Sequence, residues 1–219
     1  ELITNVSHDI KTPLTSIINY VDLLGKEKPE NEKMREYIDV LQRQSARLKK
    51  LIDDLLEASK ASTGNLTVNA EPCDVGVLLD QTLGEYGEKL SAAGLEPVLT
   101  KPEKPVIIMA DGRHMWRIFD NLLNNICKYS QRGTRVYLEV CERDGKAVVT
   151  FRNISSRQLN ISSDELMERF VRGDSSRNTE GSGLGLNIAQ SLAQLQKGVM
   201  ELTVDGDLFK VTLTFDVVK

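Results

Sequence analysis

Residues 134–152 have the sequence TRVYLEVCERDGKAVVTFR. Apolar and polar side chains alternate over 134–141 and again over 146–152, which is the period of a strand with one buried face. Between the two runs stands Asp144-Gly145, a dipeptide typical of a two-residue hairpin turn. This stretch therefore predicts an antiparallel pair of strands, and with it a sheet in the C-terminal part of the chain.

Helical and strand patterns extend outward from this hairpin. Before it, Asp111 is suited to cap a helix that runs to Tyr129. After it, an irregular stretch over 154–182 leads to a helix over 184–196. The remaining elements that we expect are a helix over 74–93 and strands over 66–69, 97–100, 106–109, 199–204 and 208–217, the last two joined by an Asp205-Gly206 turn. Runs of strands with separate helices predict an α+β fold, here a two-layer α/β sandwich.

The N-terminal part has only helical patterns. Apolar residues recur at helical spacing over about 1–25 and, after Pro29, on to about Ala61. Two such helices form a hairpin whose apolar faces no third layer covers, so we expect a four-helix bundle made by a homodimer. Turn-forming residues follow. The predicted domains are therefore a helical hairpin over 1–61, a linker over 62–65 and the sandwich over 66–219.

Composition argues against several classes of function. The 219-residue chain is 40% hydrophobic and 27% charged, with a net charge of −4, so we expect a folded protein that does not bind nucleic acid. No apolar run approaches the roughly 20 residues of a membrane-spanning helix. Three cysteines without CxxC spacing indicate neither a disulfide framework nor a zinc site. Because Glu1 already lies in helical sequence, we expect further chain before it in the full protein.

The segment SHDIKTPLT, residues 7–15, combines a histidine with an acidic neighbour in the first helix. A carboxylate such as Asp9 beside the imidazole of His8 can hold one ring nitrogen protonated and leave the other as a nucleophile. Pro13 removes a backbone donor and is expected to loosen or kink the helix one turn later. On this segment alone, a surface histidine with a chance acidic neighbour remains the alternative.

The segment NLLNNICKY, residues 121–129, places polar groups on one side of a helix. Asn121, Asn125 and Lys128 are spaced four and three apart, which brings two amides and an ammonium onto one face. Such a face suits a hydrated Mg²⁺ ion and its phosphates, because Mg²⁺ keeps several waters and takes few protein ligands. The alternative is that the amides only solvate the helix, although asparagine is a poor residue for a helix interior.

A glycine-rich stretch, GSGLGL over residues 181–186, opens the helix over 184–196. Glycines let a backbone approach phosphates closely, and the N-terminus of a helix offers free N–H groups to an anion. Its spacing is neither that of the dinucleotide fingerprint nor that of the P-loop. Taken alone, it is also compatible with a merely flexible loop.

Taken together and in this order, the three segments closely resemble the histidine kinase family over nearly the whole chain. Residues 7–15 resemble its phosphoacceptor box, 121–130 its asparagine box, Phe170 its phenylalanine box and 181–186 its second glycine box. The resemblance implies a dimerisation and phosphotransfer hairpin joined to a Bergerat-type ATP-binding domain, the fold of gyrase-type topoisomerases and heat-shock chaperone ATPases.

The resemblance also implies an activity and a setting. The expected reaction is ATP-dependent autophosphorylation of a histidine, followed by transfer to an aspartate of a response regulator, with phosphatase activity toward that regulator as a further option. ATP and Mg²⁺ would be the cofactors and a homodimer the functional unit. The chain would be the cytoplasmic segment of a bacterial inner-membrane sensor, anchored through a missing N-terminal region.

Roles follow for individual residues by the same resemblance. On the hairpin, His8 would accept the phosphoryl group, Asp9 would act as the orienting base, and Thr12 would orient water in the phosphatase reaction. In the ATP-binding domain the implied residues are Asn125 as magnesium ligand with Asn121 in support, Lys128 and Arg172 on the phosphates, Tyr129 beside the nucleotide, and Gly181, Gly183 and Gly185 in the glycine box.

One departure from the family concerns the adenine. The family's first glycine box supplies an Asp that accepts the adenine amino hydrogen, followed by glycine; Asn153 and Ser155 stand at these positions. A neutral amide oxygen is a weaker acceptor than a carboxylate. A smaller departure is His114, where the family often has Arg; we interpret it as structural.

Two other functions remain open at this point. An ATPase machine of the same superfamily would release phosphate without labelling the protein. A nucleotide-sensing scaffold, inactive because of Asn153, would act through dimer contacts or as a phosphatase through Thr12.

Overall fold

The computed structural model describes residues 2–27, 31–62, 66–159 and 183–218, with side chains in the first helix described from Pro13 onward. The chain divides into two compact units, Glu1–Lys60 and Ala61–Lys219.

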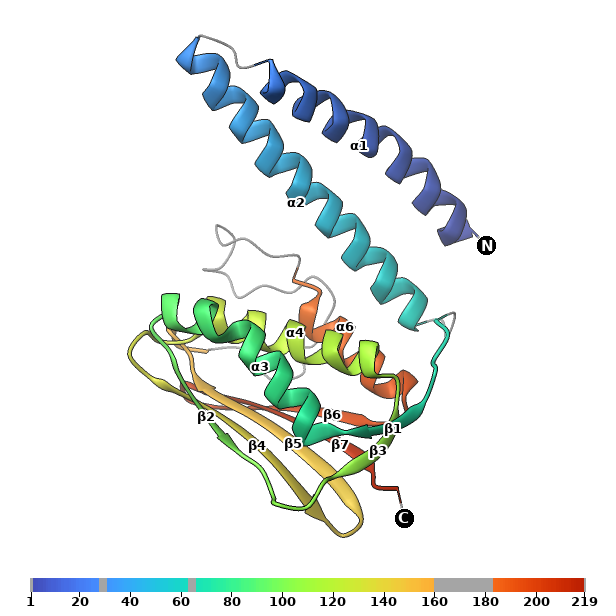
Figure 1. The fold of residues 1–219 in the computed structure, drawn as a ribbon, viewed down its shortest axis with the longest axis vertical. Coiled ribbons are helices and arrows are strands. Elements are labelled where there is room, and N and C mark those ends of the chain that lie inside the picture. The colour runs from blue at the N-terminus through green and yellow to red at the C-terminus, as the bar shows by residue number, and fades with distance from the viewer. Residues whose placement is uncertain (1, 28–30, 63–65, 160–182, 219) are drawn as a thin grey trace. The chain divides into compact units, whose positions relative to one another are not determined.

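The first unit is a hairpin of two long helices, α1 (Leu2–Lys26) and α2 (Glu32–Ser62) (Figure 1). Helix α1 continues past Pro13 to one residue beyond Gly25. Leu14, Val21 and Ile38 are buried. A larger set of apolar side chains is exposed, namely Ile17, Tyr20, Leu23, Leu24, Met34, Tyr37, Val40, Leu41, Leu48 and Leu55.

The second unit is built on a five-stranded sheet with the order β2-β4-β5-β7-β6. Its strands are β2 (Glu96–Thr100), β4 (Arg135–Arg143), β5 (Lys146–Ile154), β6 (Val199–Asp205) and β7 (Leu208–Asp216). Strand β2 pairs with β4 in parallel, and all other pairs in this sheet are antiparallel. Strands β1 (Glu71–Asp74) and β3 (Ile107–Ala110) form a separate antiparallel pair.

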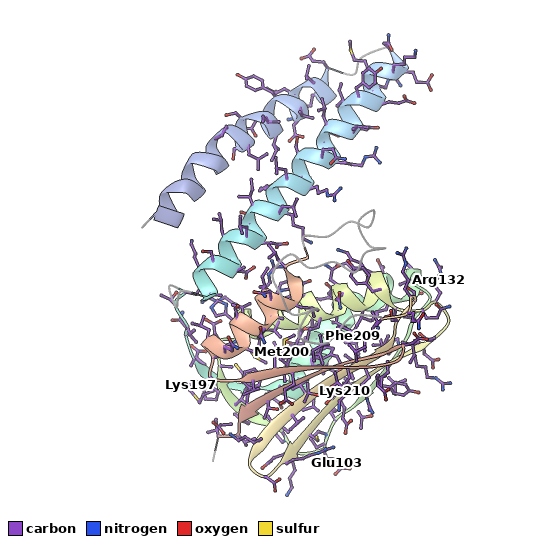
Figure 2. The ribbon with its side chains drawn as sticks, turned by 180° about the vertical axis from the view of Figure 1, so that it is seen from behind. Glu103, Arg132, Lys197, Met200, Phe209 and Lys210 are labelled. Atoms are coloured by element: carbon purple, nitrogen blue, oxygen red, sulfur yellow. The ribbon has the colours of Figure 1, made fainter. Side chains whose placement is uncertain are left out.

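Three helices, α3 (Val75–Ala92), α4 (Gly112–Tyr129) and α6 (Gly185–Leu195), cover one face of the sheet (Figure 1). The predicted α+β class and its two layers are thereby confirmed. Inward-facing side chains alternate along the strands, and the rings of Phe119 on α4 and Phe151 on β5 meet with centroids 5.7 Å apart. Met200 and Phe209 also lie between sheet and helices, whereas the neighbouring Lys210 lies on the other face (Figure 2).

The central hairpin forms as its sequence predicts. Asp144 and Gly145 both have positive φ, 51° and 72°, which is the backbone of a turn whose twist matches that of the flanking strands. In the C-terminal hairpin Asp205 pairs with Leu208, so the turn is Gly206-Asp207 and the expected Asp205-Gly206 turn was placed one residue too early. Gly206 supplies the positive φ, 57°.

The strand expected over 66–69 is wrong, because the first strand begins at Glu71. The backbone N–H of Asn69 donates to the carboxylate of Asp111 at 3.1 Å, and the Thr67 carbonyl lies 3.1 Å from Nε2 of His114. The segment therefore crosses the N-terminus of α4 instead of pairing with a strand. Asp111 is the N-cap of α4, as predicted, and accepts from the N–H of Arg113.

Candidate nucleotide-binding site

Helix α4 separates polar from apolar side chains. Leu122, Leu123 and Ile126 are buried in the core. Asn121 and Asn125 are half-buried and Lys128 is exposed, and their spacing along α4 places all three on one face. The structure thus brings together the two amides and the ammonium that the sequence singles out.

The start of α6 lies directly against this face. A Cβ atom added to Gly185 would stand 3.3 Å from Oδ1 of Asn121, so a side chain at this position would press on the amide. The Asn121 amide is itself held, because its Nδ2 donates to the carbonyl of Arg117 at 2.9 Å. Gly183, two residues before α6, has a φ of 72°, which favours glycine. Gly185 therefore belongs to the same site as the α4 face.

The end of β5 adds a second part of the site. Asn153 is only 4% exposed, and its Oδ1 has no hydrogen-bond partner among the described residues. The Oγ of Ser130, in a residue 8% exposed, is likewise buried and unpartnered within the described chain. An unsatisfied buried polar group costs about 1–3 kcal/mol, so these atoms are expected to meet a ligand or water.

Main-chain contacts fix the end of β5 to the end of α4. Ser130 and Ser155 form an isolated antiparallel bridge. The N–H of Gln131 donates to the Ile154 carbonyl at 2.8 Å, and the N–H of Ser156 donates to the Tyr129 carbonyl at 2.8 Å. Asn153 and the bridge therefore adjoin the turn of α4 that carries Tyr129, and the predicted Tyr129 is half-buried there.

These residues fit a magnesium nucleotide. A buried amide oxygen without a partner among the described residues suits a base edge, and the α4 face suits phosphates with their metal. No group of three or more His, Cys, Asp or Glu side chains that could hold a metal ion occurs in the described ranges. On the α4 face, Mg²⁺ would take the Asn125 amide oxygen, with Asn121 in support, and complete its shell with water and phosphate oxygens. Its contribution when bound would be to neutralise phosphate charge.

Several predicted site residues cannot be placed. His8, Asp9 and Thr12 lie in α1, but their side chains belong to the part that is not described. Arg172, Gly181 and the Phe170 of the predicted phenylalanine box lie outside the described residues. Their roles remain predictions.

Ser130 is a site residue to which the sequence assigned no role. It lies in the predicted asparagine box, but nothing in the pattern separates it from an ordinary helix-ending serine. Only the bridge to Ser155 and the unpartnered Oγ mark it.

A buried carboxylate organises the beginning of α4. Asp111, 2% exposed, accepts from the side chain of Arg113 at 3.0 Å and from the N–H of Asn69 at 3.1 Å. The Arg113 guanidinium holds the pKa of Asp111 well below its usual range despite burial, and the backbone N–H groups of Asn69 and Arg113 act in the same direction. The Asp111 N–H donates to Oε1 of Gln196, the residue that ends α6. We call Thr67, Asn69, Asp111, Arg113, His114 and Gln196 the Asp111 cluster.

Replacing Asp111 by asparagine is expected to lower the free energy of unfolding by about 2 kcal/mol at pH 7, because hydrogen bonds to a charged group are lost. A carboxyl group whose pKa is lowered by folding stabilises the folded state at pH values above its ordinary pKa of about 3.9. This stabilisation is lost as the pH falls below that value toward the folded-state pKa. In urea unfolding, the difference in the free energy of unfolding between wild type and Asp111→Asn should therefore become smaller below about pH 4. A gap independent of pH would contradict this role.

Asp80→Asn is the matched control for this measurement. Asp80 is exposed and pairs with Lys101 at the surface. Exposed ion pairs contribute at most about 1 kcal/mol, so this variant should unfold much like the wild type.

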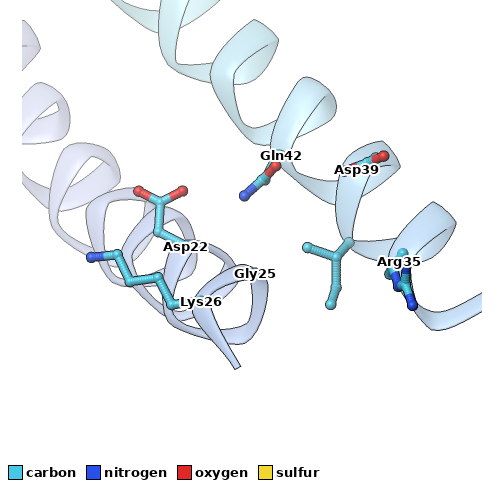
Figure 3. Close-up of a pocket in the computed structure, with 7 residues that line it drawn as sticks. Asp22, Gly25, Lys26, Arg35, Asp39 and Gln42 are labelled. Carbon is cyan, nitrogen blue, oxygen red and sulfur yellow. The ribbon is translucent and has the colours of Figure 1, made fainter. Parts of the chain in front are cut away.

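A pocket in the first unit is separate from the candidate site. It lies between α1 and α2, where Asp22 and Lys26 of α1 stand opposite Asp39 and Gln42 of α2 (Figure 3). None of its lining residues is a predicted nucleotide contact.

Among the helices of the described residues, none has both the length and the apolar character that spanning a membrane would need.

Two families of known proteins match this chain, one in each half. The family described as "Histidine kinase-, DNA gyrase B-, and HSP90-like ATPase" matches residues 110–219. The family described as "His Kinase A (phospho-acceptor) domain" matches residues 1–64. The chain thus combines a phosphoacceptor hairpin with an ATPase domain of this class, and it belongs to the sensor histidine kinase family.

Individual relatives agree with this assignment. Sensor protein VanSC of Enterococcus gallinarum is 32% identical over 88% of this chain and 54% of its own length. Sensor protein kinase WalK of Staphylococcus aureus is 27% identical over 98% of this chain and 52% of its own length. The chain therefore spans about half the length of these two relatives.

Solved structures show the same fold. The full-length ShkA crystal structure, in complex with AMPPNP, superposes with a TM-score of 0.86 at 21% identity, over 100% of this chain and 46% of that one. The Acinetobacter baumannii histidine kinase AdeS gives a TM-score of 0.65 at 18% identity, over 97% of this chain and 98% of that one.

Proposed function

We propose that this chain binds ATP with Mg²⁺ and transfers the γ-phosphoryl group to its own His8. The observation that carries the proposal is the contact of Gly185 at the start of α6 with Asn121 on the amide face of α4. It puts a glycine-opened helix N-terminus beside two amides and an ammonium, a combination suited to phosphates and a hydrated metal. The Oδ1 of Asn153, which has no partner among the described residues, would supply a polar group for the base.

Phosphoryl transfer leaves the protein little covalent work, so the residues act by positioning and by neutralising charge. A ring nitrogen of His8 would form the new N–P bond while the bond from the γ-phosphorus to the bridging oxygen breaks and ADP leaves. Asp9 would hold the other ring nitrogen protonated and so orient the imidazole. Lys128 and Arg172 would meet the phosphates.

The donor and the acceptor belong to different units. His8 lies in the helical hairpin and the nucleotide face in the second unit. We propose that the predicted linker over 62–65, whose first residue is the last of α2, lets the second unit carry the γ-phosphate to the imidazole, since transfer needs the reacting atoms about 3–3.5 Å apart.

Incubation with ATP labelled at the γ-phosphate tests this function. The protein should become labelled, and the label should be acid-labile and alkali-stable, because phosphohistidine hydrolyses in acid. Steady release of inorganic phosphate without protein label would instead indicate an ATPase machine. If neither labelling nor nucleotide binding is detected, a scaffold remains and the proposal is wrong.

We propose a homodimer as the functional unit. The exposed apolar side chains of α1 and α2, among them Ile17, Leu24, Leu41 and Leu48, would be covered by the same helices of a second copy in a four-helix bundle. Light scattering of the chain at micromolar concentration is expected to give twice the mass of one chain. A monomer under these conditions would contradict the bundle.

The onward partner in this proposal is a response regulator whose aspartate takes the phosphoryl group, with Thr12 positioning water when the reaction is hydrolytic. Transfer of label from purified phosphoprotein to a cognate regulator would test this step.

We also propose that the full-length protein is a membrane-anchored sensor, since its relatives are about twice as long as the matched segment. Recovery of full-length protein in the soluble fraction of lysed cells would contradict that anchoring.

A further inference from the structure

Two buried polar side chains where the end of α4 meets the end of β5 have unused hydrogen-bonding capacity. The Oδ1 of Asn153 and the Oγ of Ser130 are both without a partner among the described residues. They belong to one place in the fold, because Ser130 is bridged to Ser155, and Ser155 follows Asn153 by two residues on the same side of the strand. They adjoin the last turn of α4, so in the proposed nucleotide site they would form the polar part of the base pocket.

Both side chains can donate as well as accept. An amide carries an acceptor oxygen and a donor NH₂ group, and a hydroxyl rotates to do either, whereas an ionised carboxylate only accepts. The two ends of an asparagine amide are told apart by their hydrogen-bond partners, and no described residue donates a hydrogen bond to Oδ1 of Asn153. The amide can therefore turn to suit the base that enters.

We infer that this base pocket accepts GTP and ITP as well as ATP. The bases of GTP and ITP, guanine and hypoxanthine, carry a carbonyl at C6 where adenine carries an amino group. The inference rests on the proposed nucleotide site and concerns its selectivity. With the amide oxygen toward the base, Asn153 accepts from the adenine amino group. With the NH₂ group toward the base, it donates to the C6 carbonyl, and the Ser130 hydroxyl adapts in the same way.

An aspartate at position 153 would discriminate strongly between adenine and guanine, whereas asparagine would not. A carboxylate accepts a charge-assisted hydrogen bond from the adenine amino group, but it faces the carbonyl of guanine with a second acceptor and leaves both without a donor. Sites that hydrogen-bond one substrate group reject analogues that leave buried polar groups unpaired. Asparagine has nearly the same shape, so the exchange alters hydrogen bonding and charge without altering the space available.

The test is the ratio of dissociation constants for Mg²⁺-ATP, Mg²⁺-GTP and Mg²⁺-ITP, measured by calorimetry on the whole chain and on Asn153→Asp. The wild type is expected to bind all three within about tenfold of one another, since a neutral hydrogen bond is exchanged for another of similar strength. Asn153→Asp is expected to bind ATP about tenfold more tightly and GTP and ITP at least tenfold more weakly. Thermal unfolding of the variant checks that it folds.

Gln194→Glu is the matched control, because Gln194 is exposed on α6 and its exchange adds the same charge outside the pocket. Its three dissociation constants should stay in the wild-type ratio. If the wild type binds ATP but binds GTP and ITP at least a hundredfold more weakly, the inference is wrong and the proposed function stands. If the wild type binds none of the three, the proposed function itself fails. The wild-type ratio decides even if Asn153→Asp does not fold.

Discussion

Replacing His8 by glutamine is expected to reduce labelling from γ-labelled ATP at least a thousandfold, to background, while the affinity for Mg²⁺-ATP changes by less than twofold. Glutamine keeps the approximate length and polarity of histidine, but its amide nitrogen is not nucleophilic, so no N–P bond can form. Binding survives because the nucleotide face belongs to the second unit, on α4, α6 and β5. Autoradiography and calorimetry on the same preparation measure the two quantities.

The chain contains its own control for this experiment. It has two histidines, His8 and His114, so every phosphohistidine must be at one of them. His114 contacts the Thr67 carbonyl and lies 3.9 Å from Asp111, and His114→Gln should leave labelling within a few-fold of wild type. Label that persists in His8→Gln and vanishes in His114→Gln would transfer the acceptor role to His114 and overturn the proposed reaction.

Asn125→Ala is expected to have the second largest effect, a loss of at least a hundredfold in the labelling rate at fixed, subsaturating Mg²⁺-ATP. The variant removes the amide oxygen proposed to contact Mg²⁺, so the metal would lose its protein ligand on the α4 face. The fold should not suffer, because Asn125 is half-buried on a helix and alanine has the higher helix propensity. Initial rates across a Mg²⁺ titration, with a thermal melt of each variant, provide the measurement.

Asn124→Ala is the control for this variant. Asn124 is the adjacent residue on α4, half-buried like Asn125, but about 100° around the helix from it. Its exchange brings the same gain in helix propensity and should leave the rate nearly unchanged. Equal losses for both variants would mean that the asparagines act through the helix as a whole, and the assignment of Asn125 to the metal would fall.

Local patterns predicted most of the secondary structure, and a long-range contact accounts for the strand that was wrongly expected over 66–69. The hairpin around Asp144-Gly145 is set by alternation and by a turn that needs two positive φ angles, all within one stretch of sequence. The stretch over 66–69 is also partly apolar, but it does not form a strand. The backbone N–H of Asn69 donates instead to Asp111, more than 40 residues away. Periodicity also gave no sign that β2 pairs with β4 in parallel.

The candidate site was predictable to the same extent. Helical spacing alone places Asn121, Asn125 and Lys128 on one face. It does not show that Gly185 meets Asn121, because that contact joins residues from two helices. Nor does the sequence show that Oδ1 of Asn153 and Oγ of Ser130 are buried without a partner among the described residues, since burial and hydrogen bonding are properties of the folded chain.

The Asp111 cluster has a mechanical consequence. Chain that arrives from the helical unit is fastened at Asn69 to the first turn of α4, and the same aspartate is tied through Gln196 to the last turn of α6. A pull or twist transmitted along residues 66–69 is therefore applied to the two helices that carry Asn121, Asn125 and Gly185.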